Sequence, residues 1–506
     1  MLFLSSTHSD LRVFLEEVHR LAVSFPTLLS LIDADLDAHG LRKKAVRVAD
    51  KAWTEAQAVL RGCEPAFAIT APATLTLGQG RERTPAYVVF VVLLLRGYFG
   101  EGFKGCSATT LMLESTTLAV LFANLGMSMP KPSTLTELVN AVTLATRQSV
   151  LDAQIAQVAK LGLDDFKTML QDSTHVEGNT EWPTDSRLIV AIIARVLRVG
   201  ATLASLSLPV LHSSKVLRDL AEMKTLDREI DLTHGTRQGT RTRRRRYEKL
   251  LRRAHRARKT LDAAVAVIEA ALASLNVRPS RHAMATRAVT LLRADVTALQ
   301  TMIANCEARI IEGKKVAMAD KKLSVSDLDV GFIAKGQRNP VIGYKPQIAR
   351  SGEGFITGLL LPQGNASDSG QLVPMVDEVI RRTTVVPDVL SVDDGYASQA
   401  NLDALRQRHI EVISISGSKG KALTEHADWI SEAYRDARNQ RSAVESMMFT
   451  IKQGFHFGEV ARRGLTAVHC ELLEKVLAYN LCHLVRKQSA KDLAAIHRKA
   501  PLLAAA

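Results

Sequence analysis

Three acidic residues stand out because each occupies a position from which it could bind a metal ion. Asp172 and Asp393 each follow a short β-like run, and Glu445 lies in a segment with helical periodicity. Carboxylates from separate elements that converge on one point can hold two divalent cations, which activate an attacking oxygen and stabilise a leaving one. Mg²⁺ needs only a few carboxylates because it keeps several waters. The pattern therefore indicates metal-dependent phosphodiester chemistry.

The segment around Glu445 has the periodicity of an amphipathic helix. At about 100° per residue, Glu445 lies beside the apolar stripe, and Arg441 and Lys452 fall within about 40° of it. The predicted stripe is Val444, Met447, Met448 and Ile451. Such a face offers a carboxylate flanked by two cations, which suits a metal ion and DNA phosphates. The alternative is a plain i,i+4 salt bridge between Arg441 and Glu445.

Two other acids compete for the same roles. Asp394 is a credible substitute for Asp393, whereas strand alternation sends Glu177 to the face opposite Asp172, which makes Glu177 the weaker ligand. An aspartate after a strand is also commonly a turn or cap residue. Only the combination of acids favours a catalytic site.

The elements that must position these acids alternate between strands and helices. The predicted strands are 166–172, 389–392 and 412–415, with a helix at 368–383 and a helical tail from about 435. The apolar runs 341–344 and 355–361 flank the turn 351–354, which predicts a hairpin. The predicted fold class is α/β, with a mixed sheet domain interrupted by a helical insertion.

Four segments follow from these patterns. They are a helical N-terminal domain at 1–165, the mixed-sheet domain at 166–187 and 326–485, a helical basic insertion at 188–325, and a tail at 486–506. Within the first, 86–98 reads as a buried helix, and Thr134 with Glu137 reads as the capping box that begins another.

The helical insertion contains the strongest charge run of the chain. Residues 237–259 hold twelve Lys and Arg and one acid. A solvated helix face or a disordered arm would explain the run, but so many unbalanced like charges favour contacts with phosphates. The candidate DNA contacts are Arg243, Arg244, Arg245, Arg246, Lys249, Arg252 and Arg253.

The composition of the whole chain also favours a partner that carries phosphates. The 66 Lys and Arg exceed the 52 Asp and Glu, giving a formal charge of +14, which raises the odds of a polyanionic partner.

The five cysteines include no CxxC pair, so neither a disulfide framework nor a structural zinc site is indicated. The apolar run 86–95 is far shorter than the roughly 20 residues that span a bilayer, and the start is a poor signal peptide. We expect a soluble protein of a reducing cytoplasm, with no membrane partner.

Four stretches together resemble the DDE transposases of bacterial insertion sequences. The first is 172–179, DSTHVEGN, with WPTDS at 182–186, which is similar to the family's first-aspartate strand and its continuation. The second is Lys335-Gly336 with GYK at 343–345 and GNASDS at 364–369, which resembles a conserved hairpin region. Ile342 replaces the acidic residue of that family pattern.

The other two stretches carry the remaining acids. DDGY at 393–396 matches the family's D-x-G-Y, in which the first Asp is the ligand. RSAVE at 441–445, running to Lys452, resembles the helix that carries the family's glutamate, and Arg462-Arg463-Gly464 and YNL at 479–481 follow. Arg438 replaces the expected tyrosine. Within that family, the chain resembles the group of insertion sequences labelled ISNCY.

The resemblance implies an RNase H-like catalytic domain with Asp172, Asp393 and Glu445 as catalytic and metal-binding residues. It further implies two Mg²⁺ (or Mn²⁺) ions, an N-terminal DNA-end-binding domain, terminal inverted repeats and target DNA as double-stranded DNA partners, and a homodimer on paired ends. The residues expected to hold phosphates near the site are Arg441, Lys452, Arg462 and Arg463. Such an enzyme works in the bacterial cytoplasm at the nucleoid.

Two other functions would share these residues. One is an RNase H-like nuclease that cleaves without strand transfer, and the other is a catalytically inactive descendant that only binds DNA. Trp182 could stack on an unpaired base, although packing on the protein surface explains it more simply.

Overall fold

The computed structural model describes residues 10–60, 83–100, 123, 131–180, 184–209, 214–233, 237–317, 320–334 and 339–503. The chain divides into two compact units. The first comprises residues 1–37, 80–179 and 329–506, and the second comprises 38–79 and 180–328. Trp182 and Lys335-Gly336 of the sequence motifs lie outside the described residues.

A mixed five-stranded sheet forms the centre of the first unit. Its strand order is β6-β5-β1-β7-β8. The strands are β1 (Thr168–Ser173), β5 (Gln347–Ser351), β6 (Ile356–Leu360), β7 (Val389–Val392) and β8 (Val412–Ile415). β5 runs antiparallel to both β1 and β6, whereas β1, β7 and β8 are parallel to one another. The strands predicted at 166–172, 389–392 and 412–415 are therefore present.

The predicted hairpin had the wrong first strand. The strand that turns at 352–355 into β6 is β5, and the apolar run at 341–344 forms β4 (Val341–Tyr344) in a separate sheet. That smaller sheet has the order β2-β4-β3, with β2 (Val176–Glu177) and β3 (Gly331–Ile333). β5 lacks an apolar pattern, because Gln347, Arg350 and Ser351 are buried within it.

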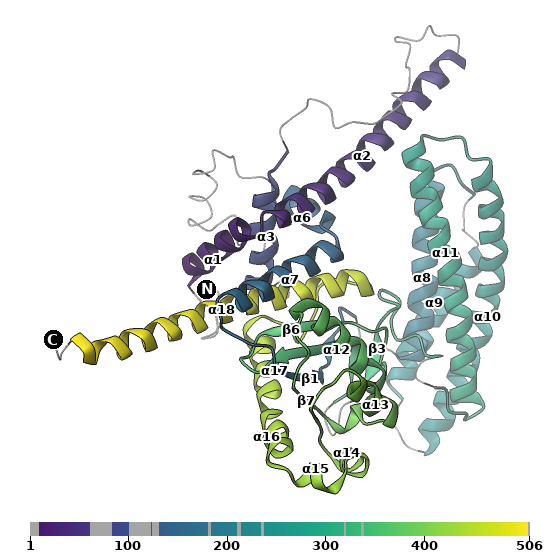
Figure 1. Ribbon diagram of the computed structural model, residues 1–506. Helices are drawn as coiled ribbons and strands as arrows, with labels where there is room; N and C mark the ends of the chain where they lie inside the picture. The colour runs from purple at the N-terminus through teal and green to yellow at the C-terminus, as the bar shows by residue number, and fades with distance from the viewer. Residues whose placement is uncertain are drawn as a thin grey trace. The chain divides into compact units, whose positions relative to one another are not determined.

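Two helices bury the apolar side chains of one sheet face. They are α12 (Ser369–Thr383), within the predicted 368–383, and α13 (Gln399–Gln407). Leu372, Met375 and Val376 of α12 pack against Met169 of β1 and Leu390 of β7 in one cluster. Figure 1 shows α12 lying across the strands. This cluster fixes the strands whose ends carry the two aspartates.

Several helices from the N-terminal part of this unit pack around the long C-terminal helix. α18 (Leu465–Leu503) packs against α1 (Leu11–Ser24), α3 (Ala86–Phe99) and α7 (Leu144–Lys160), and α6 (Pro132–Ala141) packs on α3. α3 is buried along its length, as its apolar sequence predicted. The predicted helix start at Thr134 was wrong, because α6 begins at Pro132, a residue suited to the first helical position. α2 (Thr27–Leu60) has residues in both units.

Short helices follow the last strand of the sheet. They are α14 (Ser418–Leu423), α15 (His426–Ile430), α16 (Glu432–Gln440) and α17 (Ser442–Gly454). α16 packs on β7 and β8, and α17 contacts β1. In α17 the four residues predicted as the core stripe are all buried. The segment that carries Glu445 is therefore the predicted amphipathic helix.

The second unit contains a bundle of long helices, which Figure 1 shows running side by side. They are α8 (Asp185–Ala204), α9 (Ser214–Asp231), α10 (Arg237–Ala273) and α11 (Pro279–Cys306), which continues into a short π-helix at Glu307–Ile311. A continuous apolar cluster joins all four helices. Along α10 the buried stripe includes Tyr247, Leu250, Ala254 and Leu261. Within the described ranges, no helix is both long enough and apolar enough to cross a membrane.

Candidate active site

The first two candidate acids lie at one edge of the five-stranded sheet. Leu170 pairs with Ser391 across the parallel strands β1 and β7, so Asp172 and Asp393 occupy equivalent positions two residues farther on. Asp172 is buried and Asp393 is half-buried. The Asp172 Oδ1 accepts the Ser173 amide at 2.7 Å, and the Asp393 Oδ1 accepts the Gly395 amide at 2.9 Å. The sheet thus brings together two acids that lie far apart in the sequence.

Asp393 and its neighbour Asp394 have different hydrogen-bond partners. The Asp394 Oδ1 accepts the amides of Lys419 and Gly420 at 2.8 and 3.0 Å, in the first turn of α14. That carboxylate is therefore committed to fixing the segment after β8. Asp393, with its carboxylate on the side of Gly395, is the better candidate ligand.

A third aspartate, which the sequence reasoning did not select, lies beside this pair. Asp368 precedes α12 and accepts Lys345 Nζ at 2.8 Å and Gln347 Nε2 at 2.7 Å. A Cβ added at Gly395 would lie 3.0 Å from Asp393 Oδ1 and 3.2 Å from Asp368 Oδ2, so both carboxylates crowd this glycine. Lys345 and Asp368 both belong to the second motif, GYK and GNASDS, and their ion pair joins its two stretches.

Tyr396 lies close to the carboxylates of these three aspartates. It lies in the short 3₁₀ turn Asp394–Tyr396, is fully buried, and donates its phenol hydrogen to Gln347 Oε1. Burial raises its pKa well above the usual value, and the carboxylates of Asp368, Asp172 and Asp393 raise it further. Three acidic groups therefore act on one phenol, which remains a hydrogen-bond donor.

Glu445 does not join the two aspartates in this structure. Its carboxylate is 64% exposed and forms an ion pair with Arg441 at 3.3 Å. Among the described residues, no three Asp, Glu, His or Cys side chains are close enough together to hold one metal ion. The oxygen ligands of Asp172 and Asp393 suit a hard divalent cation, but the three-acid site is not assembled.

Arg441 nevertheless lies at the same sheet edge. Its Nη1 donates to Ser416 Oγ at 2.9 Å, and the Ser416 amide donates to the Val392 carbonyl, one residue before Asp393. α17 therefore begins next to the end of β7. Lys452 lies half-buried farther along the helix, with its side chain beside Gly458.

The two arginines after α17 have different surroundings. Arg463 is exposed and donates to the Asn179 carbonyl at 3.0 Å and to its Oδ1 at 3.3 Å, which joins the first and fourth motifs. Arg462 is instead held in an ion pair with Glu474 at 3.0 Å. An arginine paired with a buried carboxylate is less available to a phosphate, so Arg462 is a weaker candidate for a DNA contact than Arg463.

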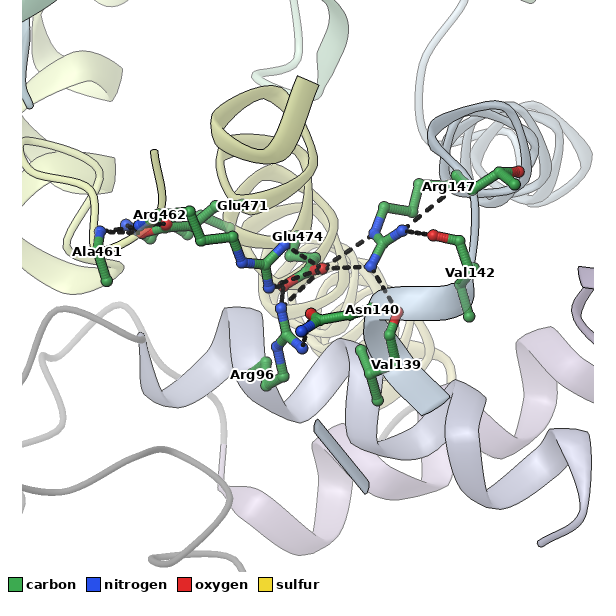
Figure 2. Close-up of polar contacts among 11 residues, drawn as sticks. Arg96, Val139, Asn140, Val142, Arg147, Ala461, Arg462, Glu471 and Glu474 are labelled. Carbon is green, nitrogen blue, oxygen red and sulfur yellow. Dashed lines mark hydrogen bonds and ion pairs between the residues drawn. The ribbon is translucent and has the colours of Figure 1, made fainter. Parts of the chain in front are cut away.

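Figure 2 shows that the same Glu474 carboxylate also receives Arg96 of α3 and Arg147 of α7. Their ion-pair distances are 3.0 and 2.9 Å, and Arg96, Arg147 and Glu474 are almost fully buried. Beside them, Glu471 accepts the amides of Ala461 and Arg462. This cluster attaches the segment after α17 and the N-terminal helices to α18.

The candidate contacts in the second unit differ in whether another side chain of the protein lies against them. Arg246 pairs with Glu229 at 3.0 Å and Arg253 pairs with Glu222. Arg244 pairs with Glu248 at 3.4 Å, and the Arg243 guanidinium lies 6.0 Å from the Tyr247 ring centroid. Arg245, Lys249 and Arg252 are exposed and recur every three to four residues, so they form one outward face of the helix.

The sequence match to known proteins covers the later part of the site. Residues 293–481 match the family model described as a transposase DDE domain. This range includes Asp393 and Glu445 but not Asp172, which lies before the helical unit. This part of the chain is therefore similar to a transposase DDE domain.

Among curated proteins, a similar relative is the transposase for insertion sequence element IS1106 from Neisseria meningitidis serogroup B. It is 24% identical over 197 residues, which are 39% of this chain and 65% of that protein. The matched region therefore spans slightly less than two thirds of the relative, and the homology is distant. No solved structure matches the chain.

Proposed function

We propose that this chain is a DNA transposase that cleaves DNA at transposon ends and joins the freed strand to target DNA. The observation that carries the proposal is the register of Asp172 and Asp393 at the carboxyl ends of adjacent parallel strands. The DDE domain match over 293–481 supports the same reading. The ISNCY subgroup stays a prediction.

The catalytic domain is proposed to have an RNase H-like fold. Counted in chain order, the large sheet has the strand order 3-2-1-4-5, with only the second strand antiparallel to the rest. The helical unit at 180–328 lies in the chain between the first and second strands of this sheet. The other predicted segments keep their proposed roles, with 1–165 binding the transposon end.

Asp172, Asp393 and Glu445 are the proposed ligands of two Mg²⁺ or Mn²⁺ ions. The bound ions would lower the barrier to in-line attack by stabilising charge on the attacking and leaving oxygens. Glu445 must approach the aspartates for this purpose. Exposed ion pairs contribute little stability, so the Arg441–Glu445 contact opposes such a movement only weakly.

The cations near the site would position the DNA. Arg441, Lys452 and Arg463 are proposed to bind phosphates next to the cleaved bond, and Arg462 is left out because Glu474 holds it. The exposed face of α10 would bind phosphates elsewhere on the duplex. Terminal inverted repeats and target DNA are the proposed partners, bound by a homodimer.

A joining assay tests this function. Full-length protein, Mg²⁺, a labelled transposon-end fragment and a target plasmid are incubated together, and joined product is measured for the wild type and for Asp393→Asn. Joined product from the wild type alone supports transposition. Cleavage without joining would favour a nuclease, and the absence of nicking by both proteins, with DNA binding retained, would favour an inactive descendant.

A further inference from the structure

α17 keeps one aromatic side chain in solvent although its apolar stripe is already buried. Val444, Met447, Met448 and Ile451 form that stripe, whereas Phe449 is 68% exposed. The other exposed large apolar side chains among the described residues are aliphatic or Met. Packing against the described residues therefore leaves the phenyl ring of Phe449 largely exposed.

Phe449 shares a face of α17 with the candidate catalytic acid. It follows Glu445 by four residues, which is about 40° around the helix and about 6 Å along its axis. The other exposed residues of this helix face are Ser442, Ser446 and Gln453. Both the carboxylate and the ring are thus presented to whatever approaches this side of the helix.

Cations lie on the adjacent side of the same helix. Arg441 and Lys452 fall about 80° and 60° from Phe449 by helical geometry, and both are half-buried. A ligand that suits this surface has negative charge for the cations and a flat apolar face for the ring. A nucleotide has both, because its phosphate is anionic and its base stacks on aromatic side chains irrespective of sequence.

We propose that Phe449 stacks on an unpaired nucleobase next to the phosphate held near Glu445. The proposal rests on the proposed transposase function, and it names the part of the DNA that this site binds, an unstacked nucleotide at the end of a duplex. The base would supply the apolar cover that the described residues do not give to this ring.

Fluorescence of 2-aminopurine, an adenine analogue that is quenched by stacking, tests the proposal. The analogue is placed in a short unpaired tail of a duplex, without divalent metal, so that no cleavage is needed. Full-length wild type, Phe449→Ala and Phe449→Trp are compared. Ile430→Ala is the control, because it removes another exposed apolar side chain, 53% exposed, from the same unit.

The wild type, Phe449→Trp and the control should all change the fluorescence on binding. Phe449→Ala should lose this change and bind the tailed duplex roughly 5- to 150-fold more weakly, with unchanged affinity for a fully paired duplex. An unchanged fluorescence response in Phe449→Ala would overturn the proposal. If Phe449→Ala also lost a dimer in sedimentation, the ring would pack against a second copy of the chain instead of a base.

The two proposals fail in distinguishable ways. A response that depends on Phe449, from a protein that never nicks DNA in Mg²⁺, would keep the stacking role and reject the enzyme. Normal nicking and joining, with a fluorescence response independent of Phe449, would keep the transposase function and reject the stacking role.

Discussion

Asp172 and Asp393 extend from paired positions of two parallel strands, since Leu170 faces Ser391 two residues before them. Side chains at equivalent positions of neighbouring strands point to the same face of a sheet. The rigid backbone therefore holds both carboxylates at one edge, independently of the helix that carries Glu445.

This relationship predicts different outcomes for two adjacent aspartates. Asp393→Asn should abolish DNA cleavage in Mg²⁺, whereas Asp394→Ala should retain it with a loss of about 0.5–2 kcal/mol in the free energy of unfolding, because Asp394 acts as a cap. Nicking assays and urea unfolding of both variants provide the measurements. If a stable Asp394→Ala lost cleavage while Asp393→Asn kept it, Asp394 and not Asp393 would be the catalytic aspartate.

The buried carboxylate of Glu474 should be important for stability. Glu474→Gln removes the counter-charge shared by Arg96, Arg147 and Arg462, and breaking such a buried ion pair costs about 3–5 kcal/mol. The control is Glu353→Gln, whose partner Lys487 is partly exposed and whose loss should cost under about 1 kcal/mol. Equal midpoints in urea for the two variants would contradict this account.

Two helical glycines should respond oppositely to alanine. A Cβ at Gly97 would lie 1.9 Å from the Glu474 carbonyl oxygen, so Gly97→Ala must push α3 away from α18 and should destabilise by about 1–3 kcal/mol. Gly370 has no atom within 4 Å of its added Cβ, and Gly370→Ala should stabilise by about 0.4–1 kcal/mol. Thermal unfolding of each variant measures both effects, and a stabilised Gly97→Ala would be incompatible with the close helix contact.

Asp295 should make the helical unit less stable as the pH rises. It is fully buried in α11, and burial raises its pKa to about 6 despite Arg195 at 3.0 Å. The folded state then holds this proton more tightly than the unfolded state, so its stabilising contribution is complete below about pH 4 and is lost as pH rises through 6.

Asp295→Asn removes this titration. The difference in unfolding free energy between wild type and variant should change by up to about 2 kcal/mol between pH 4.5 and pH 7, in favour of the variant at pH 7. Urea unfolding at both pH values measures the change. A difference that is the same at both pH values would rule out a raised pKa.

The exposed face of α10 should determine how strongly salt weakens DNA binding. Changing Arg245, Lys249 and Arg252 to Gln should reduce the slope of log K against log salt by about 0.9 for each phosphate contact, or roughly 2.7 in all. Arg246→Gln is the control, since Glu229 and Thr233 already hold that guanidinium. An unchanged slope in the triple variant would remove this face from the DNA interface.

Local patterns predicted much of the fold. The strands at β7 and β8, the helix α12 and the buried stripe of α17 all carry clear apolar periodicity, and all are present. β5 was missed because its buried side chains include Gln347 and Arg350. Gln347 is satisfied by Asp368 and Tyr396, which are distant in sequence, whereas Arg350 donates to the nearby Ser351 and Gly352 carbonyls. Such long-range hydrogen bonds leave no periodic signal in the sequence.

The site was predicted less completely than the fold. Asp368 could have been suspected from the GNASDS motif, but its pairing with Lys345 and Gln347 depends on how β5 meets α12. The ion pair between Arg462 and Glu474 could not be seen in the sequence either. Whether a charged side chain faces DNA or a buried counter-ion depends on tertiary packing.

The interruption of the large sheet by the helical unit has a consequence for folding. Met169 of β1 pairs with Ser351 of β5 and Leu390 of β7. The central strand β1 can therefore pair only after these two strands, which come much later in the chain, have been synthesised. The helical bundle, held by contacts between successive helices, can form in the meantime. During synthesis the acidic edge of the sheet therefore comes into existence late, after β7 has left the ribosome, and shorter nascent chains lack it.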